Sequence, residues 1–210
     1  MARRIVAILS AVFLAVAILS ISVLRVASVN YAFNGSSART LGETTEAGKI
    51  DVSYEFPYPG RILPDHPLWS LKALRDKLWL VVTVNPSRRA ELLLLFADKR
   101  IASSKILFER GKPELAFSTL SKAEKYLQEA ANLEAENRKK GTDTKSFLTR
   151  LANASLKHRE VINGILMIAP EDARPEIIKI ENYPRNVYKN SRNILYSLGM
   201  PAPENPFSGD

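Results

Sequence analysis

The sequence contains no cysteine among its 210 residues. Disulfide bonds, thiol catalysis and zinc or iron–sulfur sites with cysteine ligands are therefore excluded. Exported bacterial domains commonly fold without disulfides, so this absence does not indicate the cytoplasm. Histidine is almost as scarce, because His66 and His158 are the only two in the chain.

Sequence motifs of catalysis are also absent. The chain has no H-E-x-x-H pair, no G-x-S-x-G turn and no phosphate-binding glycine loop. His158 falls on an apolar stripe, where a histidine is usually a satisfied core or boundary residue, with a pH switch or a metal ligand as alternatives. Asp65 and His66 beside a proline turn indicate a helix cap rather than a catalytic dyad. We therefore expect no enzyme activity, no metal ion and no cofactor.

Acidic residues are missing from the first 42 positions, and the whole chain has a net charge of +8. Without Arg3, Arg4 and Arg25, the rest carries 27 basic and 22 acidic residues, a net charge of +5. Specific nucleic-acid binding would require a concentrated basic stripe with interleaved aromatic residues, which the sequence lacks. We interpret the excess as a solvated surface and expect no specific nucleic-acid partner.

The first hydrophobic run, Ile5 to Leu24, has twenty residues without a charge. At 1.5 Å per residue, such a helix spans roughly 30 Å, the thickness of a bilayer core. Arg3 and Arg4 precede it and place that end in the cytoplasm, although Arg25 weakly opposes this orientation. We predict a single-pass signal anchor over residues 1–28, with the remainder extracytoplasmic. The alternative is a cleaved signal peptide and a secreted protein.

After this hydrophobic run, the sequence predicts a linker, an irregular lead-in, a series of helices and a tail. Residues 29–56 are rich in Gly, Ser, Thr and Glu and predict a flexible linker. The proline-rich segment 57–67 predicts a rigid irregular lead-in, and Asp65 or His66 can cap the helix that follows. Helices are then expected at the following ranges: about 67–84, 86–110, 112–139, 142–169 and 173–198. Pro184 should kink or split the last of these near Asn182. Residues 200–210, with three prolines, predict a disordered tail.

Apolar periodicity within these helices predicts the fold class. In the helix over 112–139, six positions follow the heptad spacing of a bundle seam: Ala116, Leu120, Ala123, Leu127, Ala130 and Glu134. Long helices joined by short Gly, Pro or Asn turns favour an all-α antiparallel bundle of four to five helices, in residues 57–199, behind one N-terminal transmembrane helix.

The first helix of this bundle carries the only two tryptophans, Trp69 and Trp79. Its apolar stripe is expected to face the core: Leu68, Leu71, Leu74 or Leu78, and Val81 or Val82. The tryptophans are expected to pack in the core or in a groove, and a ligand or membrane-interface contact is the alternative. Trp69, Trp79 and His66 are thus the candidate contact residues for a ligand or partner.

Several motifs together resemble a bacterial family known as domain of unknown function 5667. They are Tyr58-Pro59-Gly60, Leu63-Pro64-Asp65, Pro67-Leu68, Leu71-Lys72, Asn85-Pro86, Arg89-Ala90-Glu91-Leu92, Ala97-Asp98-Lys99-Arg100, Ile101-Ala102, Gly111-Lys112, Glu114-Leu115-Ala116 and Tyr126. The resemblance covers about residues 58–169 and is most specific at its start. It implies an exported, membrane-anchored helical protein, some of whose relatives are attached to anti-sigma-type regulators, and it carries over no catalytic residue. Trp69 stands where the family more often has tyrosine, and His66 where it has a small polar residue, which argues against a family-wide metal role for His66.

The expected function is a membrane-anchored extracytoplasmic interaction or sensor module without catalytic activity, which binds another envelope protein or a peptide. One alternative is an envelope ligand or polyanion binder that contacts lipid headgroups, cell-wall polymer or nucleic acid. Another is a purely structural envelope protein. Salt separates the first two, because a lipid or polymer contact weakens steeply with added salt and a hydrophobic protein interface does not.

Overall fold

The computed structural model describes residues 51–207, all within one structural unit. The predicted membrane segment, Ile5 to Leu24, and most of the predicted linker lie outside these residues. Within 51–207, no helix is long and apolar enough to cross a membrane.

The described residues form five helices and no strand, which confirms the all-α prediction. The helices are α2 (Trp69–Val82), α3 (Pro86–Glu109), α4 (Pro113–Lys139), α5 (Lys145–Ile168) and α6 (Arg174–Ser197).

Local signals set the ends of these helices close to their predicted positions. Asn85 caps α3 because its side chain accepts a hydrogen bond from the Arg88 amide at 3.0 Å, and Pro86 occupies the first turn. Gly111 ends the α3 region with a φ of +68°, a conformation that favours glycine. The boundaries of α3 are therefore encoded by residues adjacent in the chain.

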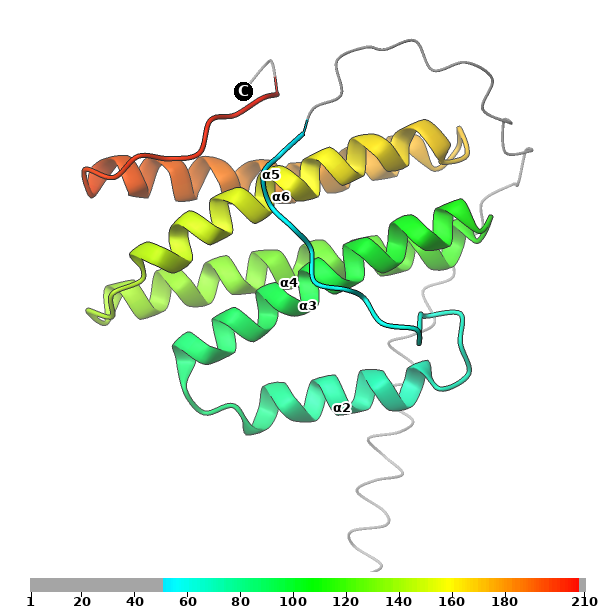
Figure 1. Ribbon diagram of the computed structural model, residues 1–210, viewed down its shortest axis with the longest axis horizontal. Coiled ribbons are helices and arrows are strands. Elements are labelled where there is room, and N and C mark those ends of the chain that lie inside the picture. Colours follow the sequence, from blue (N-terminus) through cyan, green and yellow to red (C-terminus); the bar gives the residue numbers. More distant parts are fainter. Residues whose placement is uncertain (1–50, 208–210) are drawn as a thin grey trace, which may run out of the picture. The chain divides into compact units, whose positions relative to one another are not determined.

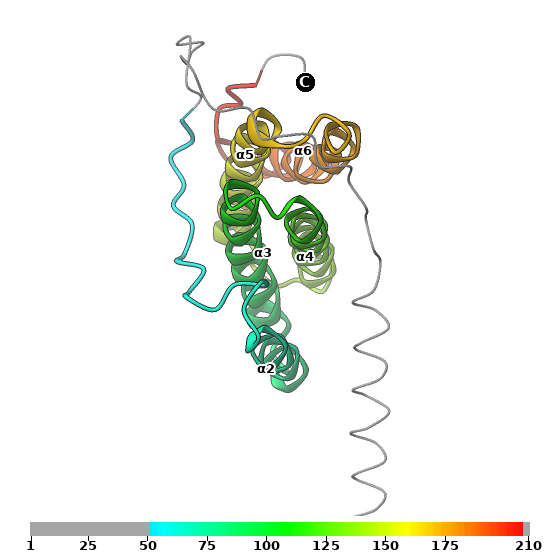
Figure 2. The same ribbon diagram turned by 90° about the vertical axis from the view of Figure 1, so that its right-hand side faces the viewer.

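The bundle consists of two antiparallel helical hairpins, α3/α4 and α5/α6 (Figure 1). The hairpins pack through α3 against α5 and α4 against α6. Figure 2 shows α2 at the end of this stack, beside α3 and far from α6. Among the described helices, α2 packs only against α3, so most of its circumference has no neighbour in the bundle.

The predicted seam of α4 lies in the core, which confirms the heptad interpretation. All six of its positions are buried: Ala116, Leu120, Ala123, Leu127, Ala130 and Glu134. The stripe of α5 is buried in the same way from Phe147 to Ile165. Alanines alternate with leucines along α4, and their small side chains let the neighbouring helices approach closely.

Helix α6 differs from the prediction at Pro184. The helix is not split there and continues from Arg174 to Ser197. Proline removes one backbone donor and crowds the preceding turn, yet Pro184 is buried between two other buried residues of the same face, Ile180 and Val187. Packing of this face against the bundle holds the helix together across the missing hydrogen bond.

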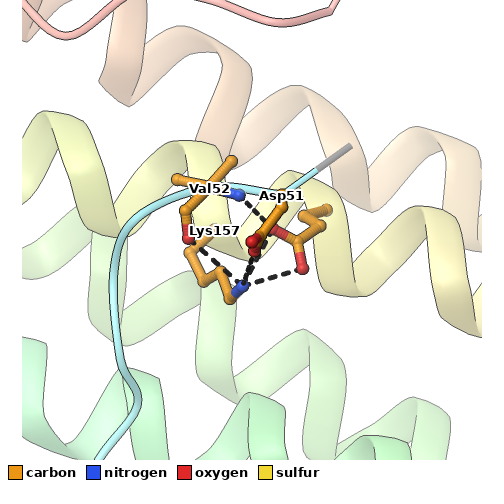
Figure 3. A network of polar contacts seen from close by, with 4 residues as sticks. Asp51, Val52 and Lys157 are labelled. Carbon is orange, nitrogen blue, oxygen red and sulfur yellow. Dashed lines mark hydrogen bonds and ion pairs between the residues drawn. The ribbon is translucent and has the colours of Figure 1, made fainter. Parts of the chain in front are cut away.

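Both ends of the described chain pack against the bundle, although residues 51–56 were predicted as part of a flexible linker and residues 200–207 as part of a disordered tail. At the N-terminal end, the Val52 amide donates to Glu160 Oε2 at 2.8 Å, and Lys157 Nζ donates to the Val52 carbonyl at 3.3 Å (Figure 3). At the C-terminal end, Phe207 is buried and Tyr188 Oη donates to the Pro203 carbonyl at 2.7 Å. The amino-acid composition of these segments predicted mobility, because it does not reveal that a few widely spaced apolar residues pack against the bundle.

Candidate functional site

The outward side of α2 is an exposed apolar surface, which we call the α2 outer face. It consists of Leu71, Leu74, Leu78, Val81 and Val82. Leu71 is 66% exposed and Val81 is 73% exposed, so the prediction that this stripe lies in the core is wrong. The reason is positional, since α2 contacts one helix only and the bundle contacts its opposite side.

The inward side of α2 carries the residues that hold the helix on α3. Leu80 and Asp76 are buried there. The Trp79 ring meets the edge of Phe96 at 6.2 Å between centroids, and Trp79 remains 43% exposed. Trp69 is half-buried, with the Arg100 guanidinium 5.9 Å from its ring centroid. The two predicted contact residues therefore line the junction between α2 and α3, with Trp79 at its edge.

Lys72 ties the proline-rich segment to α2. Its ammonium donates to the carbonyl of Pro59 at 2.8 Å and to that of Ile62 at 2.9 Å. Burial lowers the pKa of Lys72 below its usual value. Gly60, between these acceptors, has a φ of +90° that only glycine adopts readily. The sharp bend at Gly60 lets two carbonyls converge on one ammonium, which fixes the path of the chain into α2.

The Asp65-His66 pair does not form the predicted helix cap. The position before α2 is Leu68, and no side chain caps it. Asp65 instead accepts from Lys112 at 2.8 Å and from Arg110 at 3.2 Å, and these contacts lower the pKa of its carboxyl. His66 is exposed, and its Nδ1 accepts from the Leu68 amide at 3.1 Å. Asp65 thus fastens the segment before α2 to the turn between α3 and α4, and His66 contacts only its own segment.

Basic residues border the α2 outer face. Arg61, Arg75 and Lys77 are exposed, whereas Asp76, the only acidic residue of α2, is 4% exposed and accepts from Arg75 at 2.6 Å. A groove of about 610 Å³ runs along the face and the proline-rich segment. Its lining includes Arg61, Leu68, Leu71, Lys72, Leu74 and Leu78. The groove therefore combines an aliphatic floor with basic edges.

A second groove, of about 730 Å³, lies between α2, α3 and α4. Leu80, Leu93 and Tyr126 contribute apolar and aromatic surface to it. Its charged lining is mixed, comprising Lys77, Arg89, Glu129, Glu136 and Lys140. Lys77 and Val81 belong to this lining too, so the α2 outer face adjoins a groove of mixed charge on one side.

His158 lies in the bundle interior between two carboxylates. It is 0% exposed, with Nδ1 2.7 Å from Glu124 Oε1 and Nε2 3.1 Å from Asp98 Oδ1. Burial lowers its pKa, but the Glu124 charge and the hydrogen bonds with both carboxylates outweigh this and raise the pKa to about 9. Tyr54 Oη donates to Asp98 Oδ2 at 2.8 Å, and the Phe56 ring meets the imidazole edge-on at 5.3 Å. The prediction of a satisfied core histidine is confirmed.

The carboxylates around His158 were not identified from the sequence. Asp98 and Glu124 sit on the apolar faces of α3 and α4, and a charged residue inside an apolar stripe is the signal that could have revealed them. In residues 51–207, no group of three or more His, Cys, Asp or Glu side chains is arranged to hold a metal ion. The cluster joins one imidazole to two carboxylates in the core, and Glu124 Oε2 has no hydrogen-bond partner among the described residues.

Comparison with known families gives one match. Residues 61–172 match the family described as Domain of unknown function (DUF5667). The chain belongs to this family. No curated protein and no solved structure matches the chain.

The DUF5667 match contains both features described above. The α2 outer face and its basic neighbours lie within residues 61–172, as do Asp98, Glu124 and His158. Tyr54 and Phe56, which cover the histidine, lie before the matched residues, and α6 lies after them. The surface on α2 is thus part of the segment that defines the family.

Proposed function

We propose that this chain is a membrane-anchored extracytoplasmic interaction or sensor module without catalytic activity, and that it acts through the α2 outer face. The observation that carries this proposal is the exposure of five large aliphatic side chains on one helix. Contiguous apolar patches on soluble surfaces commonly mark interaction sites. The partner is a component of the cell envelope.

The attachment of α2 supports this role. Lys72, Trp69 and Trp79 hold the inward side, so the outer face is presented on a fixed helix. A preorganised surface loses little conformational entropy when a partner binds. None of these inward contacts uses a residue of the outer face, which leaves that face available.

The burial of the interior network supports a role without catalysis. His158 is fully buried, and both of its ring nitrogens contact carboxylates. A general base must reach the proton that it abstracts, and a substrate has no route to this imidazole past Phe56 and the helices. The network is better explained as a structural element of the bundle.

The N-terminal sequence supports the membrane anchor. Ile5 to Leu24 is uncharged and long enough to span a bilayer, and Arg3 and Arg4 precede it. With the arginines in the cytoplasm, residues 51–207 would lie on the opposite side of the membrane.

Photo-crosslinking in intact cells tests the proposal. A photoreactive amino acid replaces Leu74 on the α2 outer face, and a matched variant carries it at Ile178, which is 54% exposed on α6. We expect covalent adducts with an envelope protein or lipid from position 74 and few from position 178. Equal yields at both positions would contradict a role for α2 and would favour a purely structural protein.

A further inference from the structure

We infer that the α2 outer face docks on the anionic lipid surface of a membrane, with α2 lying in the plane of the interface. This inference rests on the proposed function and names the partner of the same surface. It uses three features of the described residues: the arrangement of the apolar side chains, the sign of the surrounding charges and the size of the face.

The apolar side chains form one stripe between two basic borders. At 100° per residue, Leu71, Leu74, Leu78, Val81 and Val82 fall within an arc of about 100° on α2. Arg75 follows one edge of this arc and Lys77 the other. Basic residues beside an apolar stripe suit a helix in the interface, because its aliphatic side enters the acyl boundary while the cations reach the headgroups.

The exposed charges on α2 itself and at Arg61 have one sign. Glu129 and Glu136 of α4 lie beside Val81 and Lys77 in the neighbouring groove, where Arg89 and Lys140 balance them. Arg61, Arg75 and Lys77 are exposed, and the one acid of α2, Asp76, is buried against Arg75. The nearest acid before the helix, Asp65, already binds Lys112 and Arg110. Anionic headgroups complement such a surface, and each Lys or Arg near them strengthens binding about fivefold.

A second copy of the chain fits the face less well. A twofold interface would place Arg75 and Lys77 of one copy against the same residues of the other, which repel. The five partly exposed side chains of the face offer less area than the about 800 Å² that a stable interface buries on each partner. A bilayer has no such area requirement, because each aliphatic side chain enters the acyl region independently.

The chain length before α2 allows the contact. Only 26 residues separate the predicted membrane segment, which ends at Leu24, from Asp51. Taken as a coil, 26 residues span about 28 Å. Fully extended, the same residues reach up to about 90 Å. That reach allows α2 to contact the membrane, although Val52 is held on α5 and α2 lies at the far end of the stack (Figure 2).

Quenching of a single introduced tryptophan tests the inference, and both natural tryptophans, which lie on α2, are first replaced. The full-length chain is reconstituted into phosphatidylcholine–phosphatidylglycerol vesicles with brominated acyl chains, which quench nearby tryptophan. In a Trp69→Phe/Trp79→Phe background, one variant carries Leu78→Trp on the outer face. A matched variant carries Ile178→Trp on α6, which is exposed but distant from α2. Thermal melts establish that every variant is folded.

We expect strong quenching for Leu78→Trp and little for Ile178→Trp. Replacing both Arg61 and Lys77 with glutamine should reduce the docked-to-undocked ratio about thirtyfold on anionic vesicles. The same replacement should have little effect on pure phosphatidylcholine. Leu71→Ser with Val82→Ser should reduce quenching on both lipid mixtures, because it removes apolar area without changing charge.

Three results would overturn the inference. The first is no quenching for Leu78→Trp on anionic vesicles, and the second is equal quenching with and without the replacement of Arg61 and Lys77. The third is a disulfide crosslink between two copies through Leu78→Cys. If the lipid is not contacted but position 74 still crosslinks to an envelope protein in cells, the proposed function stands and the lipid inference fails. If neither occurs, both fail.

Discussion

His158 contacts two carboxylates inside the bundle, and this determines its charge. A neutral imidazole donates from one nitrogen only, whereas the imidazolium donates from both. Glu124 and Asp98 both present acceptor oxygens, at 2.7 and 3.1 Å, so only the protonated imidazole donates to both carboxylates. Tyr54 supplies a further donor to Asp98, and burial together with the Asp98 charge raises the pKa of the Tyr54 hydroxyl.

This network predicts a loss of stability at alkaline pH. The pKa of His158 is about 9 in the folded chain against 6.5 for an ordinary histidine, so protonation stabilises the fold fully below pH 6.5. The contribution is lost as pH rises through about 9, and it amounts to roughly 3 kcal/mol. Urea unfolding at about pH 6 and about pH 9.5 measures the difference.

The matched control is Glu124→Gln, which retains a hydrogen-bonding oxygen but removes one charge. Its unfolding free energy should depend less on pH over the same interval, because the largest electrostatic cause of the raised His158 pKa is gone. The same pH dependence in both proteins would show that other groups are responsible.

Helices α2 and α4 show how far periodicity alone can be used. In α4 the apolar stripe predicts the buried side, because other helices cover it. In α2 a stripe of the same kind faces outward, and the inward side consists of Trp69, Asp76, Trp79 and Leu80. Periodicity identifies an apolar face, but a neighbour must be present for that face to be buried.

The two sides of α2 should therefore respond differently to substitution. Trp79→Ala should lower the free energy of unfolding by about 1–2 kcal/mol, because it removes a half-buried ring that meets Phe96. Leu71→Ser on the outer face should change it by less than about 0.5 kcal/mol. Leu120→Ala, which truncates a fully buried side chain of α4, is the reference for a core substitution, with an expected loss of unfolding free energy of about 2–5 kcal/mol. Chemical denaturation measures all three, and a large loss for Leu71→Ser would place the outer face in a packed interface.

At the scale of the whole molecule, the two ends of the described chain close one hydrophobic cluster. Val52 and Phe207 both pack with Leu148, Tyr188 and Leu195 of α5 and α6. The Arg159 guanidinium lies 4.2 Å from the Phe207 ring centroid, which adds a cation–π contact. Segments distant in sequence thus stabilise the same side of the bundle.

Phe207→Ala should lower the free energy of unfolding by about 3 kcal/mol, because it opens a cavity in this cluster and removes the contact with Arg159. Tyr196→Ala is a suitable control, since Tyr196 is an exposed aromatic residue of α6, and it should have an effect below about 0.5 kcal/mol. Urea denaturation checks both. Equal stability of Phe207→Ala and the unmodified chain would restore the prediction of a disordered tail.

The sequence by itself determined the helices, their ends and the α4 seam. These features depend on neighbours along the chain: Asn85 and Pro86 begin α3, Gly111 ends it, and the heptad from Ala116 to Glu134 marks one side of α4. Such signals act over a few residues, and any structure that keeps the helices must satisfy them.

Only the tertiary structure decided what surrounds each face. It joined Asp98, Glu124 and His158 from three different helices, and it set the side of α2 that meets α3. Apolar residues occupy both sides of α2, so its own sequence could not select one. Phe96 and Arg100 of α3 accommodate the tryptophans, and that packing turns the leucines and valines outward, where the proposed contact with the membrane is made.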